Sequence, residues 1–207
     1  MTERRLQLEI WSDLVCPWCY IGKRRMEKAL AQLGGEYEVQ VEWLPFQLNP
    51  GMPPEGLPRA EYRKAKFGSV ERGQALDARV AKEGEGEGIA FAFERMQRTP
   101  STIAAHQLID LAQGQGKGNA VVDALFRAYF EEARDIGDPA VLADIAAAAG
   151  VANWPAGADA PHVAEQEEFV RELGISGVPT FIVDRKAGVS GAYPPDILAQ
   201  FLRENAA

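Results

Sequence analysis

The only two cysteines of this 207-residue chain are separated by two residues in the segment CPWC, which runs from Cys16 to Cys19. The residues before it, Arg5–Trp11, alternate between apolar and polar side chains, which is the period of a strand with one buried face. After it, Met26 and Leu30 belong to an apolar stripe at helical spacing. A pair of thiols at the junction of a strand and a helix indicates a redox centre.

The predicted helix begins directly after Cys16. Proline suits the first turn of a helix, where its missing N–H has no partner to lose, so Pro17 marks the helix start. Free backbone N–H groups and the positive end of the helix dipole then face Cys16. Such an environment lowers the pKa of a cysteine from roughly 8.5 to between about 3.5 and 7.5. Cys19 lies one turn further on, where it is suited to attack a mixed disulfide formed at Cys16.

Two other uses of the cysteine pair are weighed against redox chemistry. A zinc site needs four ligands, and the only histidines, His106 and His162, lie far along the chain at no finger-like spacing. A static disulfide across so short a loop would stabilise the fold little. We therefore expect redox chemistry, and we expect no metal site.

The composition predicts a soluble globular protein. The chain is 46% hydrophobic and 25% charged, which is ordinary for a folded domain. Its 22 basic and 30 acidic side chains give a net charge of −8, which argues against nucleic acid or an anionic membrane as a partner. The first residues lack the apolar core of a signal peptide. We expect a cytoplasmic location, where a CxxC pair is more often catalytic than structural.

The pattern along the chain predicts a sheet domain that is interrupted by helices. A second strand alternates over Tyr37–Trp43, and residues 59–173 are mostly helical. Within them, the acidic run Glu83–Gly88 is interpreted as a solvated connection, and Thr99 with Pro100 is interpreted as a helix start.

The last third of the chain returns to strands. The runs 178–183 and 188–191 are predicted strands, and a terminal helix is predicted from Pro194. The expected order is β-α-β, helical subdomain, β-β-α. Residues 1–58 and 174–207 would form one α/β domain, with 59–173 inserted as a helical subdomain.

These motifs resemble a known family. CPWC on the first helix, together with GVPTF (177–181) before a later strand, is similar to the thioredoxin superfamily, and the helical insertion resembles its DsbA family. Further segments resemble the FrnE-like cytosolic branch of DsbA proteins: SDLVCPWCYIG (12–22), PFQLNP (45–50), AH (105–106) and SGAYPP (190–195).

The resemblance implies a thioredoxin-like α/β fold and a role for each motif. Cys16 is the implied nucleophile and Cys19 the implied resolving thiol. Val178–Pro179 is implied to be a cis peptide, which exposes the Val178 backbone for pairing with an extended substrate. From the residues alone, Pro179 can equally be read as the start of a strand. Substrates would be proteins or small molecules with thiols or disulfides; no cofactor is implied, and glutathione is a candidate redox partner.

Three departures from the family pattern bear on the chemistry. Trp18 stands where periplasmic DsbA proteins carry a histidine that stabilises the thiolate. Ile10 stands where thioredoxin and DsbA proteins commonly bury a carboxylate. Asp13 could relay the proton instead, or it could be a turn or cap residue. The second cysteine pair of some FrnE-like proteins is missing from this sequence. Pro17 and Asp13 are the residues expected to tune the thiols.

Some further residues are candidates for binding a substrate. His106 either faces the groove and binds a substrate carboxylate or packs within a helix bundle. Trp11, Trp18 and Phe46 either line an apolar groove or, for Trp11 and Phe46, belong to the core. Trp18, Val178 and Pro179 are the other expected substrate contacts.

Three functions are considered for this sequence. The leading prediction is a thiol–disulfide oxidoreductase that works through a mixed disulfide at CPWC. The alternative is a glutathione-dependent transferase or isomerase of the kappa or hydroxychromene-carboxylate type, although these usually have serine at the position of Cys16. The third is a holdase or binding scaffold, which leaves the cysteine pair unexplained. The sequence leaves open the direction of electron flow and the oligomeric state.

Overall fold

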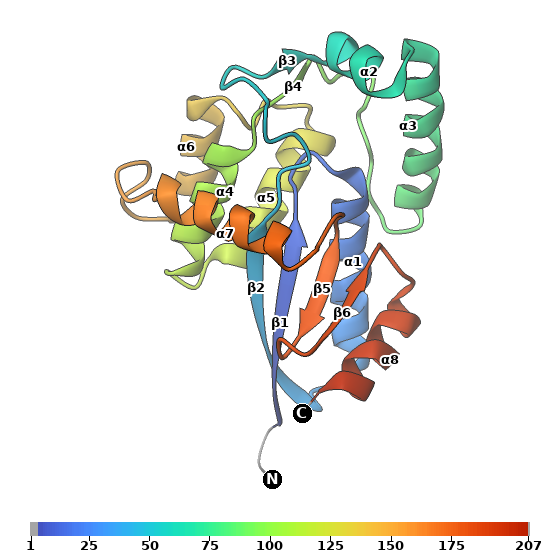
Figure 1. The fold of residues 1–207 in the computed structure, drawn as a ribbon, viewed down its shortest axis with the longest axis vertical. Coiled ribbons are helices and arrows are strands. Elements are labelled where there is room, and N and C mark those ends of the chain that lie inside the picture. The colour runs from blue at the N-terminus through green and yellow to red at the C-terminus, as the bar shows by residue number, and fades with distance from the viewer. Residues whose placement is uncertain (1–3, 207) are drawn as a thin grey trace.

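The structure, a computed structural model, describes residues 4–206. Its centre is a four-stranded sheet in the order β2-β1-β5-β6 (Figure 1). β1 (Arg4–Ser12) pairs in parallel with β2 (Tyr37–Pro45) and antiparallel with β5 (Thr180–Val183), which pairs antiparallel with β6 (Ala187–Ser190). β1 is therefore the strand that joins the N-terminal and C-terminal parts of the chain.

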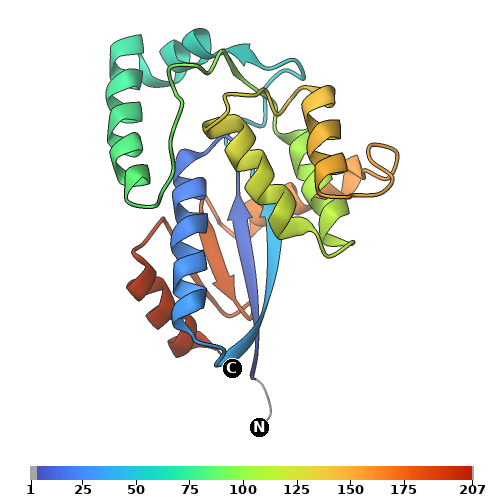
Figure 2. The ribbon, with the colours of Figure 1, turned by 180° about the vertical axis from the view of Figure 1, so that it is seen from behind.

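Helices cover the two faces of the sheet. α1 (Pro17–Gln32) and α8 (Pro195–Asn205) pack together on one face (Figure 2). α7 (Ala160–Glu172) crosses the other face near the end of β1 that leads into α1 (Figure 1). Because strand side chains alternate, Ile10 points into the core beneath α1, whereas Trp11 belongs to a second buried cluster with Val170 of α7.

The segment between the two halves of the sheet is helical, as the sequence predicts. It contains α2 (Arg59–Phe67), α3 (Val70–Glu85), α4 (Ile103–Gln113), α5 (Gly118–Phe130) and α6 (Pro139–Ala148), followed by α7, and the short strands β3 (Leu57–Pro58) and β4 (Arg98–Thr99) pair at its edge. The predicted order β-α-β, helical segment, β-β-α is thus confirmed. The predicted domain limits remain a prediction.

The helix-start signals in this segment were partly correct. Asp138 caps α6, and its side chain accepts a hydrogen bond from the Ala140 N–H at 2.8 Å. The start predicted at Thr99 is wrong, because Thr99 lies in β4 opposite Leu57 and α4 begins only at Ile103. Strand pairing with a segment some forty residues away takes precedence over the local helix-start signal there.

The interpretation of the acidic run Glu83–Gly88 as a solvated connection is wrong. α3 continues into this run and ends at Glu85, and Arg25 of α1 binds Glu83 at 2.9 Å and Glu87 at 2.7 Å. Lys28 binds Glu87 at 2.7 Å as well. Burial raises the pKa of Glu87, but hydrogen bonds from Lys28 and Arg25 outweigh it, so this pKa lies below its ordinary value. The run therefore tethers the insertion to α1.

The sheet and the insertion share one hydrophobic core. Tyr20, the residue after Cys19, is fully buried. Its ring stacks on Phe126 of α5 at 5.0 Å between centroids and lies 6.1 Å from Phe130. Aromatic pairs at these separations contribute roughly 0.5–1.5 kcal/mol beyond their buried area. The first turn of α1 is therefore anchored in the insertion.

The two histidines of the chain both lie where α4 and α7 meet. His162 of α7 places Nδ1 3.0 Å from Oδ2 of Asp110 on α4. The hydrogen bond to Asp110 raises the pKa of His162 above its ordinary value, against a smaller opposing effect of desolvation. A histidine whose pKa is raised by folding stabilises the fold fully below its unfolded pKa of about 6.5, and this stabilisation is lost as the pH rises through the folded value.

We predict that His162→Gln lowers the free energy of unfolding more at pH about 5.5 than at pH about 8.5, on either side of the ordinary histidine pKa. Urea unfolding of both proteins at several pH values measures the difference. Asp110→Asn/His162→Gln is the matched control. Its stability should lose the same pH dependence as that of His162→Gln, because the single change already breaks the pair. Parallel stability curves for the wild type and His162→Gln would contradict the role of this pair.

Candidate active site

The CPWC segment lies at the end of β1 and forms the start of α1. Cys16 is the N-cap residue, with extended backbone angles of φ −92° and ψ 110°, and Pro17 occupies the first helical turn. The carbonyl of Cys16 accepts the N–H of Cys19 at 3.0 Å. No disulfide joins Cys16 to Cys19. The structure thus places Cys16 at the helix N-terminus, as the sequence predicts.

The two thiols differ in their surroundings. Cys16 is 6% exposed and Cys19 is 1% exposed. Burial raises the pKa of Cys19 well above its ordinary value, and the neighbouring Cys16 raises it further. The Asp13 backbone and the Ser12 side chain act on this pKa in the opposite direction and are smaller influences. Burial therefore favours the thiol form of Cys19.

The loop before β5 faces Cys16. The Val178–Pro179 peptide bond is cis, which confirms the expectation from the family resemblance. The Cys16 thiol donates a long hydrogen bond to the Val178 carbonyl, with 3.8 Å between sulfur and oxygen. The loop is held from behind, because the Pro179 carbonyl accepts the Gly191 N–H and the Thr180 hydroxyl bonds to the Gly177 carbonyl, both at 2.8 Å. A second cis bond, Trp154–Pro155, lies in the insertion, and the sequence analysis did not predict it.

Asp13 and His106 meet in the interior beside the cysteine loop. Oδ1 of Asp13 lies 3.4 Å from Nε2 of His106, and Oδ2 accepts the Leu48 N–H at 2.8 Å. Asp13 is fully buried and His106 is 4% exposed. The Asp13 carbonyl also accepts the Cys16 N–H at 3.1 Å, which is the turn role weighed for this residue. A substrate-binding role for His106 stays a prediction, and its burial favours a role through Asp13.

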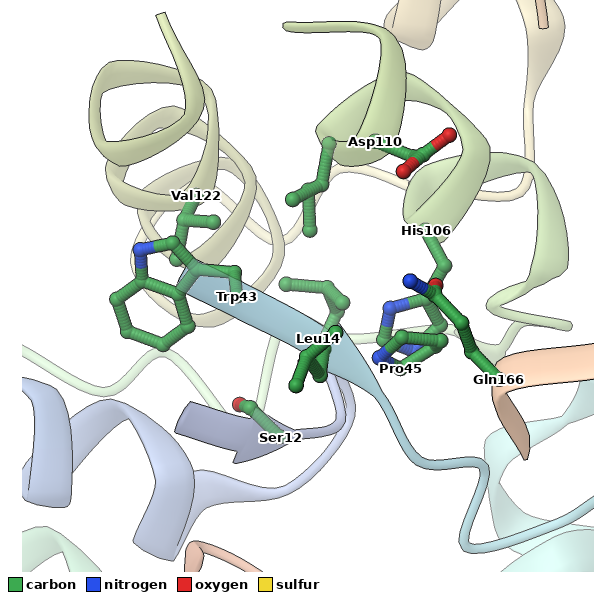
Figure 3. A pocket seen from close by; sticks show the side chains of 10 residues that line it. Ser12, Leu14, Trp43, Pro45, His106, Asp110, Val122 and Gln166 are labelled. Carbon is green, nitrogen blue, oxygen red and sulfur yellow. The ribbon is translucent and has the colours of Figure 1, made fainter. Parts of the chain in front are cut away.

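A small cavity lies beside this pair. Figure 3 shows His106 on the same side of the cavity as Pro45 and Gln166, with Trp43 and Ser12 on the other side. Its volume is about 10 Å³, which is close to the room that one water molecule needs. The cavity is too small for a substrate.

The remaining aromatic candidates divide between core and surface. Trp11 and Phe46 are buried with Leu44 and Val170 in the second core cluster, so the core alternative is correct for both. Trp18 is partly buried and packs against the main core. Its contact with a substrate remains a prediction.

A third charged group near Asp13 was missed by the sequence analysis. Oε1 of Glu167, on α7, is buried and has no hydrogen-bond partner among residues 4–206. Burial is the largest influence and raises the pKa of Glu167 above its ordinary value, while His106 lowers this pKa and Asp13 raises it. No local signal marks this residue, because it lies about 150 positions from Asp13 and only the packing of α7 brings it here.

Two searches of the described residues were negative. Within residues 4–206, no group of three or more His, Cys, Asp or Glu side chains is arranged to hold a metal ion. No helix in the same part of the chain combines the length and the apolar character that crossing a membrane requires.

The fold and the CxxC pair at the start of α1 define a thioredoxin-like protein of the DsbA type. The chain belongs to the DSBA-like thioredoxin domain family, whose model matches residues 7–203. The crystal structure of a probable DsbA oxidoreductase from Streptomyces coelicolor has 35% sequence identity and a TM-score of 0.86, over 96% of this chain and 89% of that one. The uncharacterised protein YwbO of Bacillus subtilis is 26% identical over 96% of both chains.

A more distant structure shares the fold. The cytosolic disulfide reductase DsbM of Pseudomonas aeruginosa, in a structure with GSH, has a TM-score of 0.62 and 19% identity, over 96% of this chain and 98% of that one. This likeness concerns the fold alone.

Gly22 of α1 lies at the contact between this helix and the Val178 loop. A Cβ atom on Gly22 would lie 2.8 Å from Cγ of Pro179 and 3.4 Å from the Phe181 ring. Real Cβ contacts are almost never that short, so a side chain here would move either the loop or the helix. Gly22 therefore determines how closely Pro179 approaches the cysteine helix.

We predict that Gly22→Ala slows disulfide exchange by roughly tenfold or more, because small displacements of reacting groups are costly. Overpacking costs about 1–3 kcal/mol, which exceeds the roughly 1 kcal/mol that alanine gains in helix propensity. Exchange kinetics and urea unfolding measure the two effects. Gly51→Ala is the matched control, since its Cβ meets nothing within 4 Å. Equal rates in both variants would show that the close approach of Pro179 is unimportant.

Proposed function

We propose that this protein is a thiol–disulfide oxidoreductase in which Cys16 is the nucleophile and Cys19 resolves the mixed disulfide. The observation that carries the proposal is the asymmetry of the two thiols. Cys16 stands at the helix N-terminus against the Val178 carbonyl, whereas Cys19 is more deeply buried and its pKa is raised. A helix N-terminus favours a thiolate, and the thiolate is the attacking species.

The proposed reaction has two exchange steps. The Cys16 thiolate attacks one sulfur of a substrate disulfide, forms a mixed disulfide and releases the other sulfur as a thiolate, which takes up a proton from solvent. Cys19 then gives up its proton and attacks the sulfur of Cys16. The second substrate sulfur leaves and is protonated, so that the substrate is reduced and Cys16–Cys19 is oxidised. The reverse sequence oxidises a dithiol, and the relative reduction potentials decide the direction.

The Val178 backbone and Trp18 are the proposed substrate contacts. The Val178 carbonyl lies next to the Cys16 sulfur, so an extended segment around a substrate cysteine could pair with the Val178 backbone like an added strand. Trp18 lies between the two cysteines in the sequence and offers partly exposed apolar surface. Pro17 starts the helix and so fixes the orientation of Cys16.

We further propose a cytosolic location and glutathione as the redox partner. The chain has only two cysteines, and both belong to the redox pair, which suits a reducing compartment where structural disulfides are rare. The likeness to DsbM, a cytosolic reductase whose structure was determined with GSH, supports both proposals at the level of the fold. A metal or another cofactor has no part in this scheme.

Cysteine variants test the order of the chemistry. We predict that Cys19→Ser accumulates mixed disulfides through Cys16, because the resolving thiol is missing, whereas Cys16→Ser traps nothing. Insulin reduction and dithiol oxidation should fall to background in both variants. Mass spectrometry of the trapped species and the two activity assays measure this.

The control is Cys16→Ser/Cys19→Ser, which should fold and trap nothing. Equal trapping by the two single variants would contradict the assigned roles. Absence of dithiol activity in the wild type, with full glutathione conjugation or isomerisation of a small aromatic by Cys19→Ser, would favour the transferase alternative, since that chemistry needs only one group to stabilise a bound thiolate.

The residue between the cysteines should set the potential. We predict that Trp18→His makes the Cys16–Cys19 couple more oxidising, because an imidazole can donate to the Cys16 thiolate or carry positive charge beside it. Equilibration with glutathione measures the potential. Trp18→Phe is the matched control, which keeps apolar surface and adds no charge. A shift of the same size in both variants would indicate a packing effect.

A further inference from the structure

Asp13 lies in the loop that leads from β1 to the cysteine helix. Its carbonyl accepts the Cys16 N–H at 3.1 Å. Its carboxylate is fully buried. A buried anion is costly unless a charge or hydrogen bonds compensate it, and a like charge nearby disfavours a thiolate.

The compensation available to Asp13 is asymmetric. Oδ2 accepts the Leu48 N–H at 2.8 Å. Oδ1 has no hydrogen-bond partner within the part of the chain that the structure describes, and neither does Nε2 of His106. These two atoms face one another at 3.4 Å. Two buried polar atoms that have only each other form an ion pair when the imidazole is protonated.

The surroundings of the pair include few other charges. Glu167 faces His106 and Asp13 from α7, and the charge of Arg171 lowers the pKa of Glu167 against the larger effect of burial. Tyr129 of α5 is buried. Burial is the main cause of its raised pKa, and the charge of Asp13 raises this pKa further. No arginine or lysine is within salt-bridge distance of Asp13 among residues 4–206. Within residues 4–206, His106 is therefore the basic side chain that lies within salt-bridge distance of Asp13.

We propose that His106 is a positioning residue whose imidazolium balances the buried Asp13 carboxylate, and that it thereby sets the thiolate population of Cys16 and the redox equilibrium of the cysteine pair. The inference rests on the proposed function of the two cysteines. Because His106 belongs to α4, it makes the redox centre dependent on the helical insertion. Its effect passes through Asp13, and no direct contact with the substrate is needed.

Three variants test the charge balance. In His106→Gln, the Asp13 carboxylate is left uncompensated three residues before Cys16, so the pH midpoint of Cys16 alkylation should rise. The reduced protein then becomes less stable relative to the disulfide, and oxidation by glutathione disulfide should become roughly threefold to tenfold more favourable. Asp13→Asn removes the anion and should shift both quantities the other way or leave them unchanged. Asp13→Asn/His106→Gln should return both towards the wild type.

The other histidine supplies a matched control. His162→Gln removes an imidazole that pairs with Asp110 of the same helix α4, and it should leave the alkylation midpoint and the glutathione equilibrium unchanged. If the role of His106 is purely structural, the double variant should deviate more from the wild type than His106→Gln does, both in the alkylation midpoint and in the glutathione equilibrium. That result, or an unchanged His106→Gln, would overturn the proposal.

A measurement on the wild type needs no variant of His106 to fold. With only two histidines, ¹⁵N-labelled imidazoles can be assigned by comparison with His162→Gln. His106 should carry protons on both ring nitrogens in the folded protein, and a neutral ring there would overturn the proposal. Failure of the wild type to equilibrate with glutathione would count against the proposed function instead, because the NMR measurement is independent of turnover.

Discussion

The antiparallel pairing of β1 with β5 joins two segments of the chain that are far apart in sequence. Ile10 lies opposite Phe181 and Trp11 opposite Thr180. This register places the Val178 loop at the end of β1 from which the cysteine loop leaves, so that Cys16 meets the Val178 carbonyl across 162 residues of sequence. A slip of one residue would move Phe181 and Val183 out of the main core and Ile182 away from the second cluster. Packing on both faces of β5 therefore maintains the geometry of the site.

The insertion completes the sheet domain as well as interrupting it. Its α4 covers the edge of β2, where the Gln113 side chain accepts the Trp43 N–H at 2.5 Å and donates to the Trp43 carbonyl at 2.9 Å. An unpaired strand edge would otherwise offer these groups to another chain. The same helix carries His106, and α5 supplies the rings that hold Tyr20. One set of contacts thus serves both the stability of the sheet and the position of the cysteine helix.

The electrostatics of the site follow from burial more than from proximity in sequence. Desolvation is the largest influence on the pKa of Cys19 and of Glu167 and raises both. In a water-poor interior, each charge must be compensated by the few groups that packing brings within reach. Asp13 and His106 come from the sheet domain and the insertion, so the join between these two parts is also where the charges near the cysteines are balanced.

The sequence alone determined the main strands of the sheet and the place of the cysteine pair at the start of a helix. Alternation over Arg5–Trp11 and the proline after Cys16 are local signals, because strand period and helix start depend on a few neighbouring residues. Only the tertiary structure decided which distant side chains meet. Asp13 with His106, and Arg25 with Glu87, are partners separated by tens of residues, and no local pattern encodes such pairs. The helix start predicted at Thr99 failed for the same reason, since long-range pairing with Leu57 outweighed a local preference.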